Sequence, residues 1–363
     1  MDITEIFLEK LRKEYRSLVA VKDLTLKVED RSLVTLLGPS GCGKTTTLKM
    51  ICGLIPPTSG EIYFDNVKVT YLRPQERKAG LVFQDYAVFP TMSAFDNIAF
   101  GLKIKGVPKR EIKKRVMEVA ETLNIVEVLN TMPGRMTQSE LQSIALARTL
   151  VTNPSVLLLD EPLSNLDAAF RIRMRAELKR LQKEIQQTVI YVTHDQIEAM
   201  SISDRIAIMN LGVLHQYGTP SEVYNQPKTK FVAGFIGSPP MNFIDCTFLE
   251  DVGCLDLGFG RLDIGKFKDI VDEEASSSEL IMGVRPEDIK VESKPEFKES
   301  MEIVVEAYEP LGDEAIVDAD LGGNLVRMAV PITLTANPGD KKYVRFDLNR
   351  IHIIDKKTEN VIV

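Results

Sequence analysis

Two groups of residues in this sequence have the types and spacing needed to handle a phosphate. The first is the stretch 38–45, which fits the pattern G-x-x-x-x-G-K-[ST] and lies between an apolar stretch, 33–37, and a helix-forming stretch. Backbone N–H groups must point inward at phosphate oxygens there, and glycine best tolerates the conformations this requires. A helix that begins at Lys44 directs its positive end at the same anion. The pattern therefore predicts a loop that holds the phosphates of a nucleotide.

Within this loop, Lys44 is expected to contact the β- and γ-phosphates, and Thr45 to offer its hydroxyl to Mg²⁺. Cys42 lies among N–H groups, beside Lys44 and at a helix N-terminus, and all three features favour the thiolate. We therefore expect a reactive thiol there. The residues expected to bind the cofactor in this loop are Gly38, Pro39, Ser40, Gly41, Cys42, Gly43, Lys44, Thr45 and Thr46.

The second group is the acidic pair Asp160-Glu161, which ends the buried-type strand in "PSVLLLDEPLSNLD". An acidic pair at the carboxyl end of a parallel strand is expected beside a phosphate site. Asp160 would hold Mg²⁺, and Glu161 would orient and polarise the attacking water. The two groups together predict a nucleoside triphosphatase.

At this point the sequence resembles the ATP-binding-cassette ATPases, and further residues match the motifs of that family in order. The resemblance implies that Tyr15 stacks on adenine, that Gln84 reaches Mg²⁺ and the attacking water, and that His194 contacts the γ-phosphate. It also implies that the loop 164–167, which ends at Asp167, contacts a partner subunit. These matches fall within residues 1–235 and predict Glu161, His194 and Gln84 as the catalytic residues.

The stretch "RMTQSELQSIALARTL" departs from the family at its signature motif, Leu-Ser-Gly-Gly-Gln. Thr137 takes the place of the serine, Gln138 and Ser139 replace both glycines, and Glu140 replaces the glutamine. Thr137-x-x-Glu140 reads as a capping box that starts a helix, whose N–H groups can still face a γ-phosphate. Thr137 and Ser139 remain candidate contacts to the nucleotide. The resemblance implies that two cassettes close as a dimer around ATP. The side chains of Gln138 and Ser139 crowd the surface that meets the phosphate, and Glu140 adds negative charge near it, so we expect weak closure. The alternative is a cassette that binds ATP with little turnover.

The expected fold is an α/β P-loop NTPase with a RecA-like core and antiparallel β and helical subdomains, followed by an all-β OB-like barrel. The nucleotide-binding domain is expected over residues 1–235, with its helical subdomain at about 86–155, and the C-terminal OB-like (TOBE) domain over 236–363. In the helical part, one apolar face is predicted for Ile112, Val116, Val119, Leu123 and Val126. The resemblance makes Tyr86, Val88, Phe89 and Pro90 candidates for contact with a membrane subunit.

Charge separates the two parts of the chain. Residues 236–363 hold 14 Lys and Arg against 26 Asp and Glu, a charge of −12, whereas the rest holds 31 against 26, a charge of +5. The short strands expected in "EIVVEAYEP", "EAIVDADL", "NLVRMAVPI" and "KYVRFDLNRIHII" fit a small barrel. An acidic barrel repels nucleic acid, so a cassette ATPase acting on nucleic acid or ribosomes is disfavoured.

The phrases "FIGSPPMNFID" and "GVRPEDI" resemble the importer ATPases, and the first resembles their sugar branch more than their iron, sulfate or polyamine branches. No run of 18 apolar residues and no signal-peptide pattern is present, so separate membrane subunits are expected. Four cysteines without a C-x-x-C pair fit a reduced, cytoplasmic setting. The resemblance implies a homo- or heterodimer on the cytoplasmic face of the membrane, two permease subunits and, indirectly, an extracellular solute-binding protein.

Overall fold

The computed structural model describes residues 4–164, 166–295, 297 and 300–363. The chain forms two compact units, Met1–Pro220 and Ser221–Val363. Each unit has buried apolar clusters of its own. The first unit contains every residue for which the sequence predicts chemistry.

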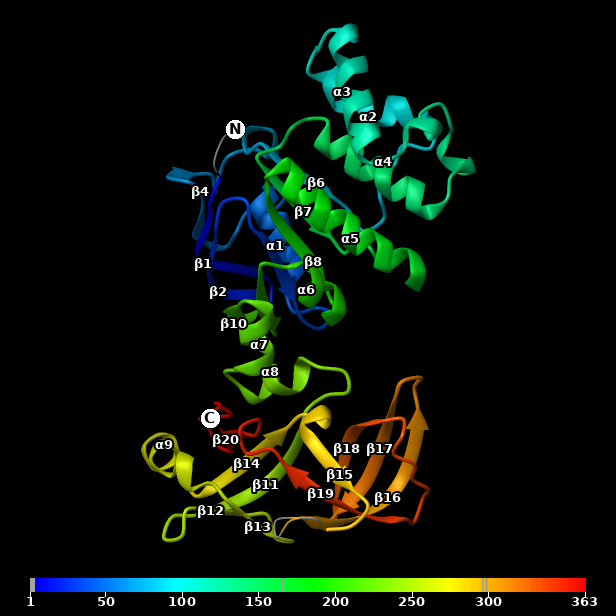
Figure 1. The fold of residues 1–363 in the computed structure, drawn as a ribbon. Helices are drawn as coiled ribbons and strands as arrows, with labels where there is room; N and C mark the ends of the chain where they lie inside the picture. The colour runs from blue at the N-terminus through cyan, green and yellow to red at the C-terminus, as the bar shows by residue number, and fades with distance from the viewer. Residues whose placement is uncertain (1–3, 165, 296, 298–299) are drawn as a thin grey trace. The chain divides into compact units, whose positions relative to one another are not determined.

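A six-stranded sheet forms the centre of the first unit, in the order β10-β9-β3-β8-β7-β6 (Figure 1). Strands β9, β3, β8, β7 and β6 run parallel, and β10 is antiparallel to β9. Because the carboxyl ends of parallel strands meet at one edge of a sheet, the residues that follow β3, β6, β7 and β8 are brought to one edge. The bounds are β3 (Leu33–Leu37), β6 (Ala79–Val82), β7 (Val156–Asp160), β8 (Thr188–Thr193), β9 (Arg205–Asn210) and β10 (Val213–Gly218).

Helices cover both faces of this sheet, and the alternation of side chains along the strands shows it. Leu157 and Leu159 of β7 pack with the helical cluster that includes α5, whereas Val156 and Leu158 pack with α1 and the antiparallel sheet. Strand β7 is therefore apolar from Val156 to Leu159, as expected of a strand buried on both faces. The helices concerned are α1 (Lys44–Cys52), α5 (Ala168–Ile185) and α6 (Gln196–Ile202).

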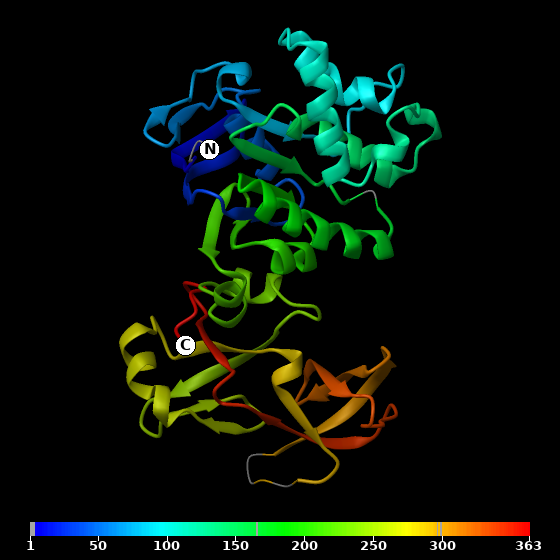
Figure 2. The ribbon, with the colours of Figure 1, turned by 45° about the horizontal axis from the view of Figure 1, so that its top comes forward.

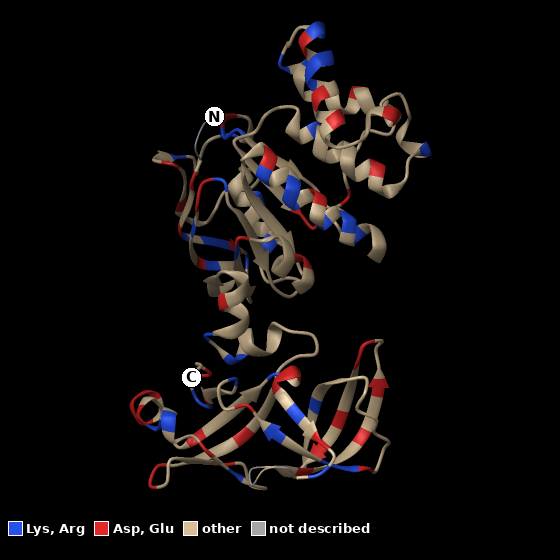
Figure 3. Ribbon diagram, viewed as in Figure 1, with Lys and Arg blue, Asp and Glu red and all other residues tan. Residues whose placement is uncertain are grey.

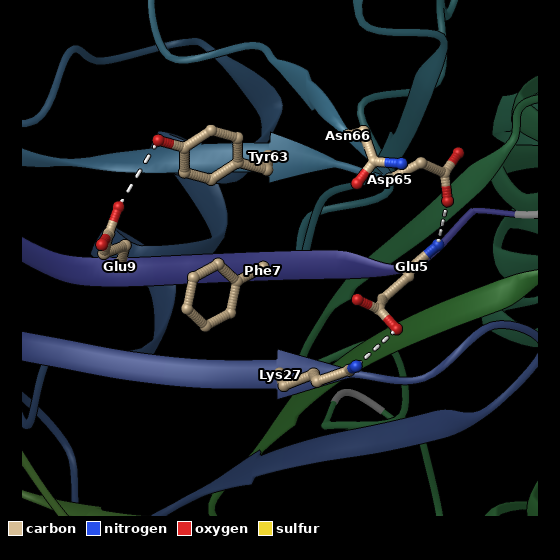
Figure 4. A pocket seen from close by; sticks show the side chains of 7 residues that line it. All are labelled: Glu5, Phe7, Glu9, Lys27, Tyr63, Asp65 and Asn66. Carbon is tan, nitrogen blue, oxygen red and sulfur yellow. Dashed lines mark hydrogen bonds and ion pairs between the residues drawn. The ribbon is translucent and has the colours of Figure 1, made fainter.

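A second, four-stranded antiparallel sheet has the order β2-β1-β4-β5. Its strands are β1 (Ile6–Tyr15), β2 (Leu18–Val28), β4 (Ser59–Phe64) and β5 (Val67–Lys68). On its outer face Phe7 and Tyr63 stack, with ring centroids 6.2 Å apart, and Lys27 pairs with Glu5 at 2.9 Å (Figure 4). These are cross-strand pairs that stabilise the sheet.

The middle of the first unit is helical. It contains α2 (Ala94–Ile104), α3 (Lys109–Thr122) and α4 (Gln138–Leu150), which lie together in Figures 1 and 2. The short 3-10 turns of the first unit are η1 (Pro74–Glu76), η2 (Val126–Val128) and η3 (Pro133–Arg135).

The predicted apolar face of this region is correct for Ile112, Val116 and Leu123, which are buried. It is wrong for Val126, which is 39% exposed. The helix ends at Thr122 and Asn124 takes a left-handed conformation, so the 3.6-residue period is broken before Val126.

The second unit begins with two short helices and continues into two five-stranded antiparallel sheets, in the orders β13-β12-β11-β14-β20 and β15-β19-β16-β17-β18. The four stretches expected as strands all contain strands, and the last contains two, β19 and β20. The bounds are α7 (Pro220–Asn225), α8 (Lys230–Phe235), β11 (Asn242–Leu249), β12 (Cys254–Asp256), β13 (Arg261–Asp263), η4 (Gly265–Phe267), α9 (Lys268–Glu274), β14 (Glu279–Val284), η5 (Pro286–Asp288), β15 (Ile289–Glu292), β16 (Met301–Pro310), β17 (Glu314–Leu321), β18 (Asn324–Pro331), β19 (Lys341–Phe346) and β20 (His352–Asp355).

The distribution of charged residues can be followed in Figure 3. Lys and Arg gather in the first turns of α3, where Lys109, Arg110, Lys113 and Lys114 lie close together in the sequence. Acidic residues are spread over the strands and loops of the second unit. Among the described residues, no helix combines the length and the apolar character needed to span a bilayer.

Candidate nucleotide site

The loop between β3 and α1 has the geometry of a phosphate cradle. Gly43 has a φ of 105°, and a Cβ built there would lie 2.4 Å from the carbonyl oxygen of Ala20. A Cβ on Gly38 would lie 2.1 Å from the carbonyl oxygen of Met209. Both positions therefore need glycine, because the neighbouring backbone leaves no room for a side chain. The following helix begins at Lys44, as predicted.

Lys44 is buried and its ammonium lies within this loop. Its Nζ donates to the carbonyl oxygens of Gly38 and Pro39 at 2.7 and 2.9 Å. Two carbonyl oxygens are modest partners for a full positive charge, and a phosphate would be a stronger one. The loop thus fits an anion at this position.

The expectation for Cys42 is wrong. Its side chain is only 2% exposed, and burial raises the pKa of the Cys42 thiol even though Lys44 Nζ lies 3.7 Å from Sγ. Loss of solvation disfavours the thiolate more than the neighbouring ammonium favours it. Cys42 is therefore a buried thiol that packs in the loop, and the same reason raises the pKa of Cys52.

The residues predicted to hold Mg²⁺ lie beside the loop. Thr45 Oγ1 donates to Asp160 Oδ1 at 2.9 Å, which joins the first turn of α1 to the end of β7. Burial raises the pKa of Asp160, which lacks a cation within ion-pair distance among the described residues. A hydroxyl and a carboxylate at this spacing are oxygen ligands of the kind that Mg²⁺ takes together with phosphates and water. In the described part of the chain, no group of three or more His, Cys, Asp or Glu side chains could hold a metal without such help.

Three predicted catalytic residues, separated widely in the sequence, meet at this edge of the sheet. His194 Nδ1 lies 3.0 Å from Glu161 Oε2, and Gln84 Nε2 lies 3.5 Å from the same oxygen. Glu161 has a φ of 45° and its N–H donates to the carbonyl oxygen of Val192 at 3.0 Å. A left-handed conformation at a non-glycine residue is costly and is found mostly where function requires it. The arrangement can hold a water beside the phosphate loop.

The N-terminus of α4 forms the capping box that the sequence predicts. Glu140 Oε2 accepts hydrogen bonds from Thr137 N and Thr137 Oγ1 at 2.7 and 2.8 Å, and Glu140 N donates to Thr137 Oγ1 at 3.3 Å. Thr137 Oγ1 also lies 2.9 Å from Ser139 Oγ. Gln138 and Ser139 are helical, so neither has a left-handed conformation. These residues bond with one another, and among the described residues they make no hydrogen bond to the phosphate loop or Glu161.

The other two predicted residues, Asp167 and Tyr15, have partners outside the Glu161 cluster. Asp167 caps α5 and accepts a hydrogen bond from Phe170 N at 2.9 Å, whereas Asn165 of the same loop lies outside the described residues. Tyr15 ends β1 and is 45% exposed, with Lys13 Nζ 5.1 Å from its ring centroid. Strand β2 of the same sheet contacts Gly43 through Ala20.

Sequence reasoning missed the role of Arg148. Its guanidinium donates to the carbonyl oxygens of Ala87 and Tyr86 at 2.6 and 3.2 Å. Both residues have positive φ, 46° and 60°. Arg148 thus holds the turn that follows Gln84. In the sequence, the feature that could have indicated this role is an arginine within an otherwise mainly apolar run.

Family models match three stretches of the chain. They are the ABC transporter model over residues 21–164, the MalK OB fold domain over residues 237–289 and the TOBE domain over residues 282–354. The predicted fold class, a P-loop ATPase followed by an OB-like domain, is confirmed by these matches and by solved structures of the same fold.

Relatives and solved structures agree with the family models. The trehalose/maltose import ATP-binding protein MalK of Thermococcus litoralis is 46% identical over 96% of this chain and 97% of that protein. The oligosaccharides import ATP-binding protein MsmX of Bacillus subtilis is 40% identical over 98% of this chain and 99% of that protein. The ATP-binding cassette MJ0796, solved as a post-hydrolysis dimer bound to ADP and Pi, gives a TM-score of 0.54 at 30% identity, over 59% of this chain and 98% of its own. The chain therefore belongs to the ABC transporter family, as one of its ATP-binding, ATP-hydrolysing subunits.

Proposed function

We propose that this ATPase powers an importer whose solute is a sugar or an oligosaccharide. The observation that carries the ATPase part of the proposal is the cluster of Glu161, His194 and Gln84 beside the Thr45–Asp160 pair. The names of the relatives that align along nearly the whole chain, trehalose/maltose and oligosaccharide import proteins, support the choice of solute. No residue of this chain is proposed to contact the solute itself.

In the proposed reaction the phosphate loop and Lys44 bind the β- and γ-phosphates of ATP, and Tyr15 stacks on adenine. Thr45, Asp160 and Gln84 would hold Mg²⁺, which when bound neutralises charge on the phosphates. Glu161 orients and polarises the attacking water, a role typical of a carboxylate in hydrogen-bond reach of it. His194, held 3.0 Å from Glu161, contacts the γ-phosphate.

We further propose that two cassettes close on ATP, each offering its α4 N-terminus to the nucleotide of the other. Thr137, Ser139 and Asp167 are the residues proposed to face the partner. The dimeric cassette of the solved relative supports this arrangement. Because Thr137 already bonds with both Ser139 and Glu140, closure has to break or share those hydrogen bonds.

The proposed partners are two permease subunits and, through them, an extracellular solute-binding protein, with the ATPase on the cytoplasmic face of the membrane. Contact with a permease is proposed for the segment 88–90, where Phe89 and Pro90 are exposed and Val88 is half-buried. Tyr86 is only 8% exposed and belongs to the core, so it is removed from the predicted contact set.

A direct test is to purify the tagged chain from its native membranes and identify the proteins that accompany it. We expect two permease subunits, and after reconstitution we expect ATPase activity that rises with a sugar and its binding protein. Co-purification with ribosomes or nucleic acid in place of permeases would refute the importer. Permeases whose ATPase responds to iron, sulfate or a polyamine, and to no sugar, would refute the solute class alone.

A further inference from the structure

A buried carboxylate lies behind the proposed catalytic cluster. Glu198 of α6 is 2% exposed, and its Oε2 accepts hydrogen bonds from Tyr191 OH and Thr193 Oγ1, both at 2.8 Å. Burial raises the pKa of Glu198. Burying a carboxylate is costly unless donors replace its water, and an apolar side chain would fill the same space at lower cost. The acidic group therefore calls for an explanation beyond packing.

Thr193 connects Glu198 to the backbone around His194. Its hydroxyl donates to Glu198 and accepts a hydrogen bond from Asp195 N at 3.0 Å. Thr193 and Asp195 are the two neighbours of His194 in the chain. Glu198 thus fixes both sides of the residue whose ring lies 3.0 Å from Glu161.

Arg171 of α5 connects the same carboxylate to the segment that follows Glu161. It donates through Nη2 to the carbonyl oxygen of Leu166 at 3.1 Å and through Nη1 to Asp195 Oδ2 at 3.4 Å. Its Nε lies 3.9 Å from Glu198 Oε1 and, within the described residues, is buried without a hydrogen bond. A single guanidinium therefore joins the loop after the proposed catalytic base to the turn that holds His194.

We propose that Glu198 is a positioning residue for ATP hydrolysis, which through Thr193 and Arg171 holds His194 and the backbone at Leu166 in register with Glu161. The inference rests on the proposed catalytic roles of Glu161 and His194. Glu161 has a strained backbone, so its carboxylate keeps its direction only if the surrounding segments are fixed. A misplacement of about 1 Å at such a site can cost on the order of 10²-fold in rate.

The test compares the steady-state ATPase of the full-length chain with four variants, together with the midpoint of thermal unfolding. Thr193→Val keeps the shape of Thr193 and removes its hydroxyl, Thr193→Ser keeps the hydroxyl, and Glu198→Gln removes the charge. The matched control is Tyr217→Phe, because the Tyr217 hydroxyl is buried without a hydrogen-bond partner among the described residues. We expect kcat to fall by about tenfold in Thr193→Val and Glu198→Gln while the KM for ATP stays within about twofold.

Thr193→Ser is expected to restore most of kcat, and Tyr217→Phe to leave kcat unchanged. A purely structural Glu198 would give the opposite pattern: lower unfolding midpoints for Glu198→Gln and Thr193→Val with wild-type kcat in the folded fraction. That result overturns the proposal, as does a Thr193→Ser variant that is as slow as Thr193→Val. If the wild-type chain and its Gln138→Gly, Ser139→Gly, Glu140→Gln variant both lacked ATPase activity, the proposed catalytic roles would fail, and the inference with them.

Discussion

At the scale of single residues, the proposed chemistry depends most on Glu161. Its carboxylate lies near His194 and Gln84. Glu161 directly follows Asp160, which is proposed to hold Mg²⁺. We expect Glu161→Gln to bind ATP with little loss and to hydrolyse it at least ~10²-fold more slowly, because general-base assistance is typically of this size. The measurements are single-turnover ATPase and nucleotide binding.

The variant should also accumulate an ATP-bound dimer, which gel filtration can detect. Glu184→Gln is the matched control, since Glu184 pairs with Arg180 on the exposed surface of α5. Equal turnover in Glu161→Gln and the wild type would remove Glu161 from the mechanism.

At the scale of elements, the N-terminus of α4 is the feature that most distinguishes this chain from its family. Glu140 is the acidic residue of the capping box, and its charge lies close to where a partner's γ-phosphate is proposed to bind. Like charges repel more strongly when a closed dimer excludes water. We expect Gln138→Gly, Ser139→Gly and Glu140→Gln together to raise basal ATPase by roughly tenfold or more, equivalent to ~1.4 kcal/mol of barrier.

Glu140→Gln alone separates charge from shape, because glutamine can keep the capping box. This single variant should give part of the increase in basal ATPase activity, with no loss of folding stability. The degenerate signature is functionally silent if the wild type already hydrolyses ATP as fast as the triple variant. ATP-dependent dimerisation, measured by light scattering, is the second readout.

A second element-scale prediction concerns Arg148, which joins α4 to the turn after Gln84. Arg148→Met leaves two carbonyl oxygens without their donor and should destabilise the turn by about 1–2 kcal/mol. We expect faster amide hydrogen exchange over residues 84–88 and a lower kcat. Arg148→Lys, which keeps a positive donor, should show a smaller change. Unaltered exchange over 84–88 in Arg148→Met would contradict this role.

At the scale of the whole molecule, each of the two units has its own apolar core, and only the first has the nucleotide site. We therefore expect calorimetry to show two unfolding transitions, of which Mg-ATP raises one. For the Glu161→Gln variant at a hundredfold excess over its Kd, the gain is about 2.7 kcal/mol. A single transition, or an equal shift of both, would show that the units unfold together.

The sequence by itself determined the residues whose chemistry depends on local backbone geometry. The glycines of the phosphate loop, the acidic pair at the end of β7 and the Thr137–Glu140 capping box could all be predicted, because each depends on neighbours within a few positions in the chain. The buried strand that ends in Asp160 followed from the same logic, since a strand buried on both faces has a recognisable pattern. Resemblance to the family added Gln84 and His194.

Only the tertiary structure decided which groups meet and which groups are buried. Gln84 and His194 reach Glu161 from positions 77 and 33 residues away, and Arg171 and Glu198 meet behind them from separate helices. The reactivity expected of Cys42 failed for the same reason: its local surroundings favour a thiolate, but packing removes the solvent that a thiolate needs. Desolvation is set by residues distant in the chain, and therefore no local pattern predicts it.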